Sequence, residues 1–143
     1  MRVANLLAVK GSEVASISQE RSVTDALATL KERGIGALIV TGPTPPLVGI
    51  FSERDVVRAL AERGASVLEA SVADLMSSEV TVCNAETTVT ELMGLMTARR
   101  IRHVPVVADG HLIGMISIGD VVKARLDELE HEKKELLDYV SSW

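Results

Sequence analysis

The stretch Gly49-Ile50-Phe51-Ser52-Glu53-Arg54-Asp55 returns later in the chain as Gly114-Met115-Ile116-Ser117-Ile118-Gly119-Asp120. Both stretches read as a glycine, two apolar residues, a serine, two variable residues and an aspartate. Apolar residues after a glycine favour the end of a strand, and a serine three residues before an acid is a capping box that begins a helix. The sequence therefore predicts the same strand-to-helix turn twice.

The similarity continues upstream of this turn with a shift of 66 residues. Ser12-Glu13-Val14 matches Ser78-Glu79-Val80, and Val23-Thr24 matches Val89-Thr90. The shift changes to 65 within a loop that is Gly42-Pro43-Thr44-Pro45-Pro46 in the first copy, where a duplicated chain tolerates a change of length. The pattern indicates an internal duplication.

Each copy predicts a β-α-β-β-α unit of about 60 residues, in an α+β (α/β-like) fold. Strands are expected at 14–17, 37–40 and 47–51 in the first copy and at 80–83, 103–107 and 112–116 in the second, with helices from the capping boxes at 22–25 and 88–91 and from 55 and 120. So small a unit buries too little surface alone, so the copies should pack together with pseudo-two-fold symmetry. The predicted organisation is an N-terminal packing segment at 1–11, repeats at 12–66 and 72–125, and a C-terminal helical extension at 126–143.

Composition restricts the function. The chain has 143 residues, a net charge of −5, 47% apolar residues and one cysteine, Cys83. This excludes a disulfide framework and a cysteine-based zinc site. The aromatic residues are Phe51, Tyr139 and Trp143, and so few rings with a negative net charge argue against nucleic acid as a partner. No apolar run is long enough for a membrane span, and we expect a cytoplasmic, reduced protein.

The doubled turn, each time preceded by a capped helix and a valine-rich strand, resembles a tandem pair of CBS domains, named for cystathionine β-synthase. The resemblance covers about residues 10–125, and Arg102-His103-Val104-Pro105-Val106 is similar to a stretch of the second domain in such pairs. It implies a pseudo-two-fold module whose two clefts bind adenosine-containing ligands such as AMP, ADP, ATP or NAD. In the family, each cleft takes the serine and aspartate of one repeat and strand residues of the other.

The resemblance assigns ligand-binding residues to two clefts. Cleft A is expected to combine Ile50, Ser52, Arg54 and Asp55 with Val82, Ile101, Arg102, His103 and Pro105. Cleft B is expected to combine Met115, Ser117, Gly119 and Asp120 with Ser16, Ile17, Ile35, Gly36 and Ala37. Because the basic residues fall in the first set, we expect phosphate in cleft A rather than cleft B.

The chemistry of the turn agrees with this assignment. An aspartate can accept hydrogen bonds from both ribose hydroxyls, and the N–H groups at a helix N-terminus favour phosphate. The same serine and aspartate could instead form a plain capping box, and the basic residues Arg100, Arg102 and His103 could be a solvated helix end and strand edge. The duplication favours ligand binding.

Other chemistry is weakly indicated. His103, His111 and His131 are scattered, so no metal-ligand spacing is visible, and Cys83 reads as a small apolar residue at a strand end. No Gly-rich phosphate loop ending in Gly-Lys-Ser/Thr and no acid–base pair is found, so we do not expect an enzyme.

The tail carries apolar residues at helical spacing, namely Leu126, Leu129, Leu136, Leu137 and Val140. This stripe could pack on its own module or on a second copy, and because CBS modules commonly pair, a homodimer is favoured. The predicted function is an adenosine-nucleotide sensor that acts through dimer geometry or on a partner protein in trans. The alternative is a structural dimerisation module with no physiological nucleotide.

Overall fold

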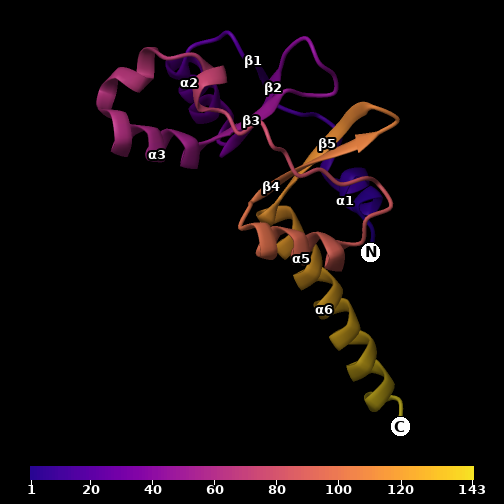
Figure 1. Ribbon diagram of the computed structural model, residues 1–143. Helices are drawn as coiled ribbons and strands as arrows, with labels where there is room; N and C mark the ends of the chain where they lie inside the picture. Colours follow the sequence, from indigo (N-terminus) through magenta and orange to yellow (C-terminus); the bar gives the residue numbers. More distant parts are fainter.

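Two small sheets, each with its own helices, make up the protein in the computed structural model, which describes residues 1–143 (Figure 1). The first half contains β1 (Ser16–Ser18), α2 (Val23–Arg33), β2 (Ala37–Thr41), β3 (Gly49–Ser52) and α3 (Glu53–Arg63). The second half contains α5 (Val89–Arg99), β4 (His103–Ala108), β5 (His111–Ser117) and α6 (Ile118–Ser141). The remaining elements are α1 (Val3–Lys10), the 3₁₀ helix η1 (Gly64–Glu69) and α4 (Val72–Leu75).

The two halves repeat the same strand register. In the first half β1 runs parallel to β2, and β2 runs antiparallel to β3 with Leu38 opposite Phe51. In the second half β4 runs antiparallel to β5 with Val104 opposite Ile116. The predicted α+β fold of two tandem repeats is confirmed.

One predicted strand is shorter than expected. Instead of a strand over 80–83, the second half has a single parallel bridge from Cys83 to Val106. The Cys83 N–H donates to the carbonyl of Pro105 (3.0 Å), and the Cys83 carbonyl accepts from the N–H of Val107 (2.9 Å). These bonds put Cys83 in the place that Ile17 of β1 occupies opposite Val40 in the first half.

The paired helices α2 and α5 begin alike and end differently. The side chains of Ser22 and Thr88 each accept a hydrogen bond from the N–H three residues later, at 3.1 Å. Helix α2 ends at Gly34, whose φ of 63° is left-handed, and α5 ends at Arg100, whose φ of 54° is also left-handed. Glycine adopts this conformation at little cost, whereas a residue with a Cβ is strained by about 1 kcal/mol.

The helix that precedes each half completes the hydrophobic core of the other half. Val3 and Leu6 of α1 are buried in the core of the second half, and the Val3 N–H donates to the carbonyl of Thr87 (2.8 Å). Val72 of α4 is buried in the core of the first half, and its N–H donates to the carbonyl of Arg21 (2.8 Å). The two halves are therefore linked by an exchange of segments.

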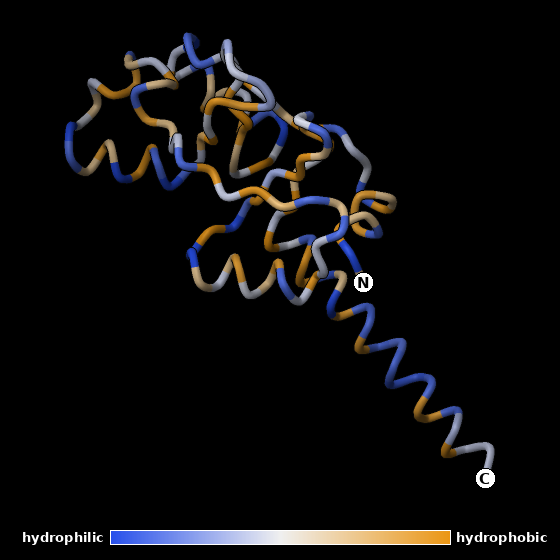
Figure 2. Tube along the Cα trace, turned by 45° about the vertical axis from the view of Figure 1, so that its right-hand side comes forward, coloured by the Kyte–Doolittle hydropathy of each residue, from blue (hydrophilic) through white to orange (hydrophobic).

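Helix α6 is one unbroken helix of 24 residues, and most of it projects away from the body (Figures 1 and 2). Only Val121 and Ala124, near its start, are buried. The apolar residues of the tail, Leu126, Leu129, Leu136, Leu137 and Val140, are between 44% and 63% exposed. The stripe does not pack on its own module. None of the helices combines the length and the apolar composition that a membrane span needs.

Candidate functional site

The two serine–aspartate turns have the same geometry. Asp55 Oδ2 accepts from the Ser52 N–H (2.8 Å) and from the Ser52 hydroxyl (3.0 Å). Asp120 Oδ2 accepts from the Ser117 N–H (2.8 Å) and hydroxyl (2.9 Å). In both turns the capping bonds use Oδ2, and Oδ1 takes no part in the cap.

In cleft A, the segment after α4 lies over the turn. Ser77 pairs with Ile50 of β3 through two main-chain hydrogen bonds of 2.9 Å, and its hydroxyl donates to Asp55 Oδ1 (3.3 Å). The Arg54 guanidinium points elsewhere and donates to the carbonyl of Arg100 (2.8 Å). The local groups of the protein thus already use the polar atoms expected to bind a ligand there.

The residues that the second repeat was expected to add to cleft A are dispersed. Pro105 is buried within β4, and Ile101 is half-buried against the core of the second half. The side chains of Val82 and Arg102 are exposed, and that of Arg102 has no hydrogen-bond or ion-pair partner.

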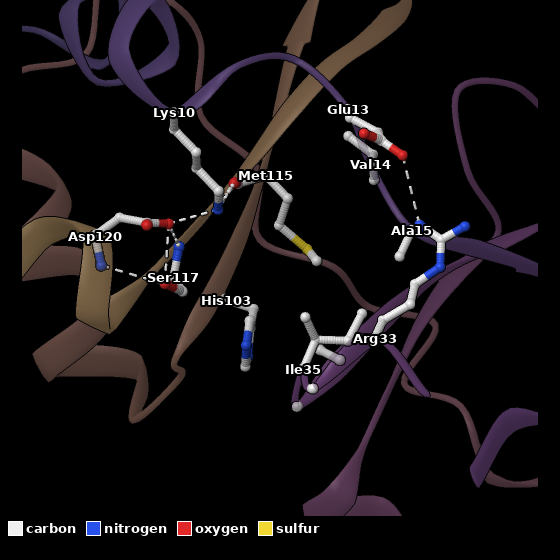
Figure 3. Close-up of a pocket in the computed structure, with 13 residues that line it drawn as sticks. Lys10, Glu13, Val14, Ala15, Arg33, Ile35, His103, Met115, Ser117 and Asp120 are labelled. Carbon is white, nitrogen blue, oxygen red and sulfur yellow. Dashed lines mark hydrogen bonds and ion pairs between the residues drawn. The ribbon is translucent and has the colours of Figure 1, made fainter. Parts of the chain in front are cut away.

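In cleft B, the turn faces a cavity of about 680 Å³ between the two halves (Figure 3). Six residues predicted for this cleft line it, namely Ile35, Gly36, Ala37, Met115, Ser117 and Asp120. The other lining residues are Lys10, Glu13, Val14, Ala15, Arg33, Gly34 and His103.

Three residues predicted for cleft B are not in its lining. The side chain of Ile17 is buried in the core of the first half, because alternate residues of a strand face opposite sides of the sheet. Ser16 and Gly119 are exposed outside the cavity. The chain reaches the cleft earlier than expected, with Val14 and Ala15.

Three basic residues line cleft B rather than cleft A. Lys10, Arg33 and His103 line cleft B, although His103 was assigned to cleft A. Lys10 Nζ donates to Asp120 Oδ2 (2.5 Å) and to the carbonyl of Met115 (2.7 Å). Arg33 forms a 3.7 Å ion pair with Glu13 across the same cavity (Figure 3).

The sequence carried a signal for only one of the basic groups that it missed. Arg33 matches Arg99 in the duplication and directly precedes the Gly34-Ile35-Gly36 segment that enters the cleft. Lys10 has no such signal, because the contact that brings it to Asp120 joins positions 110 residues apart.

The surroundings of cleft B shift the pKa values of His103 and Asp120. Burial lowers the pKa of His103, and the charge of Lys10 lowers it further, so His103 is neutral at pH 7. Burial raises the pKa of Asp120, but hydrogen bonds from Lys10 and Ser117 outweigh this effect and hold the pKa below its usual value. Elsewhere, burial raises the pKa of the Cys83 thiol to about 11, so it remains a thiol at neutral pH. The charged side chains that line the cleft are the Asp120 and Glu13 carboxylates and the Lys10 and Arg33 cations.

The comparisons with known proteins agree with this architecture. The CBS domain family matches twice, over residues 8–62 and 72–127. The mitochondrial CBS domain-containing protein CBSX3 of Arabidopsis thaliana is 41% identical over 124 residues, which cover 83% of this chain and 60% of the plant protein. The chain thus spans less than two thirds of that relative.

Solved structures give the same result. A CBS-domain-containing protein from Agrobacterium tumefaciens is 45% identical, with a TM-score of 0.85 over 87% of this chain and 99% of the other. A hexameric CBS-CP12 protein from bloom-forming cyanobacteria is 28% identical, with a TM-score of 0.75 over 85% of this chain and 66% of the other. With two family matches that cover its two halves, the chain belongs to the CBS domain family.

Proposed function

We propose that the protein is a regulatory module that binds an adenosine-containing nucleotide, of the class AMP, ADP, ATP or NAD, between its two CBS repeats. CBS domain pairs are in general regulatory modules with adenosine ligands. The observation that carries the proposal here is the cavity of cleft B, where the Ser117–Asp120 turn of one repeat faces Ile35 and Gly36 of the other. Its volume of about 680 Å³ lies within the range of small-molecule sites.

The lining of cleft B offers a partner for each part of such a ligand. Asp120 Oδ1 is available to accept from the ribose hydroxyls, as acidic residues do in other nucleotide sites. The apolar side chains of Ile35 and Met115 provide faces for the adenine ring. The start of α6, with Lys10 and Arg33, provides positive potential for phosphate.

Titration calorimetry with AMP, ADP, ATP, NAD and NADH tests the proposal. The expected result is saturable binding of at least one of them. Mass spectrometry of protein purified under native conditions should detect a released adenosine-containing ligand. Heats no larger than those of dilution for all five would reject it in favour of the alternative, a structural dimerisation module. In either case the protein is expected to act without catalysis of its own and in the cytoplasm.

Assembly as a homodimer completes the proposal, and the support comes from α6. Exposed residues recur along one side of this helix in alternating steps of four and three, namely Val122, Leu126, Leu129, Lys133, Leu136, Val140 and Trp143. This spacing is typical of the a/d seam of a two-stranded coiled coil, in which a lysine at one a position helps to specify the oligomeric state at some loss of stability. In a parallel pair, Arg125 lies opposite Glu130 of the second copy, and Glu132 lies beside Lys133 of the second copy.

Sedimentation equilibrium at micromolar concentration tests the assembly. The full chain should sediment with twice its 15.3 kDa mass, and Leu129→Asp should shift it toward monomer while the nucleotide affinity of cleft B persists. A single species near 15.3 kDa for the full chain would refute the dimer, and a hexamer would match the assembly named for the cyanobacterial relative. Through such an interface, or through a partner protein in trans, ligand binding would be passed on.

A further inference from the structure

Lys10 is bonded to the aspartate that the proposed function assigns to the ribose. Helix α1 ends at Lys10, and the lysine side chain reaches across the edge of β5 to Asp120 Oδ2 and the Met115 carbonyl (Figure 3). Both members of the ion pair are partly shielded, with side-chain exposures of 36% for Lys10 and 26% for Asp120. A nucleotide whose two ribose hydroxyls take both carboxylate oxygens of Asp120 must therefore compete with Lys10 for Oδ2.

The contact is easily exchanged. An ammonium group has three donors on a flexible stem, and Lys10 uses one on Asp120 and one on a carbonyl. Lys10 is the last residue of α1, so its stem can turn without disturbing the buried residues Val3 and Leu6 that hold the helix. Removal of the cation without a replacement, however, leaves both charges poorly compensated in a partly dry cleft.

We propose that Lys10 is a transferable cation that selects phosphorylated ligands in cleft B. Before a ligand binds, Lys10 neutralises Asp120. When a nucleotide enters, its ribose hydroxyls take over the carboxylate, and its phosphate takes over the ammonium group. This inference rests on the proposed function and deepens it.

The selectivity follows from charge balance. Adenosine can displace Lys10 from Asp120 but offers it no anion in return. AMP offers the same hydroxyls and also an anion, so the lysine exchanges one charged partner for another. Arg33 lines the same cavity but is already paired with Glu13, and His103 is neutral at pH 7 because burial lowers its pKa. Lys10 is therefore the group whose partner must change with the ligand.

Cleft A lacks this device. There the segment that covers the turn contacts Asp55 with the neutral hydroxyl of Ser77. A hydroxyl released from a carboxylate can turn to water at little cost, so its displacement does not favour a phosphate. The selection is thus a property of cleft B.

The test compares adenosine with AMP in the parent chain, in Lys10→Met and in the control Lys31→Met, whose lysine lies on α2 outside the lining of cleft B. Occupancy of cleft B is followed through the methyl NMR signal of Met115, which lines it. The parent should prefer AMP. Lys10→Met should bind adenosine about threefold more tightly and lose about tenfold of the preference for AMP, the scale of one hydrogen bond to a charged group. Lys31→Met should behave as the parent.

The outcomes distinguish a failure of the Lys10 proposal from a failure of the proposed function. If Lys10→Met tightens adenosine and AMP equally, Lys10 only blocks the cleft, and the transfer is refuted. An unchanged affinity for both ligands would refute it as well. If the parent chain moves the Met115 signal with neither ligand, nor with ATP or NAD, the proposed function of cleft B fails first. The unfolding midpoint of each variant should match the parent within a few degrees, since Lys31 is exposed and the Asp120 carboxylate left by Lys10→Met keeps its bonds from Ser117.

Discussion

The same serine–aspartate turn occurs in both repeats, but a different segment covers it in each. Over β3 of the first repeat the cover is main chain, because Ser77 is bonded to Ile50 in both directions. Over β5 of the second repeat the cover is side chain, because Leu7 and Lys10 of α1 reach down onto it. The duplication thus preserved the backbone of the site, whereas the segment laid over it decides which cleft can open.

Substitution of the equivalent glycines Gly49 and Gly114 should give the largest difference in stability between the two repeats. A Cβ at Gly49 would lie 2.8 Å from the carbonyl oxygen of Ser77 and 2.7 Å from the sulfur of Met76, whereas a Cβ at Gly114 would lie 2.5 Å from a terminal methyl of Leu7. Main chain cannot yield, but a leucine can change rotamer. We expect Gly49→Ala to lower the free energy of unfolding by about 3 kcal/mol and Gly114→Ala by about 1 kcal/mol.

Urea unfolding of both variants measures these effects. Equal losses would mean that α1 is held as firmly as the Ser77 segment, and the contrast between the covers would then be lost.

Removal of the two aspartates sharpens the contrast at the level of binding. We expect Asp120→Ala to weaken the nucleotide by about 1.5 to 3 kcal/mol, the scale of a hydrogen bond to a charged group. Asp55→Ala should have the smaller effect, because Ser77 already takes Oδ1 of Asp55, whereas Oδ1 of Asp120 has no partner within the protein. Calorimetry with AMP decides between them, and a larger loss in Asp55→Ala would return the main site to cleft A, where the sequence placed it.

The C-terminal ends of α2 and α5 also differ between the two repeats, and substitutions there should have a smaller effect on stability. Gly34 and Arg100 share a left-handed conformation, so Gly34→Ala should lower the free energy of unfolding by about 1 kcal/mol. Arg100→Gly should raise it by about 0.5 kcal/mol, since relief of the strain is partly offset by the added freedom of the unfolded chain. Thermal unfolding shows the sign, and a loss of stability in Arg100→Gly would mean that the arginine side chain contributes more than its strain.

The smallest expected effect is a dependence on pH in cleft B. Burial and Lys10 lower the pKa of His103, Arg102 acts in the same direction, and Asp120 and Glu53 oppose them. The unfolded chain therefore takes up this proton first as the pH falls below about 6.5, and the contribution of His103 to stability decreases on acidification. In the same range a protonated His103 adds a cation to the cleft, so the affinity for nucleotide should rise.

Measurement of both quantities between about pH 7.5 and 5.5 tests this, with His103→Gln as the control that removes the His103 contribution. The phosphate of AMP titrates in this range too, so the difference between parent and control is the quantity of interest. Identical pH profiles in the two proteins would show that protonation of His103 affects neither stability nor binding.

What the sequence predicted was local, and what it missed depends on tertiary contacts. The caps at Ser22 and Thr88 and both serine–aspartate turns need only neighbours within four residues, and all of them form. The strand over 80–83 depends on pairing with β4, and only Cys83 achieves it. The sequence did not place Lys10 beside Asp120, because Lys10 comes from a helix that crosses to the other half.

The packing of α1 on the second half also determines the order in which the protein can fold during synthesis. A ribosome delivers the N-terminal segment first, and domains generally fold as they emerge. The first half can close as soon as Val67 and Val72 have been made, because both belong to its own core. Helix α1 must wait, with Val3 and Leu6 uncovered, until β5 and the start of α6 have been synthesised. Helix α1 is thus synthesised before both halves but packs only after the second, and until then Lys10 is not beside Asp120.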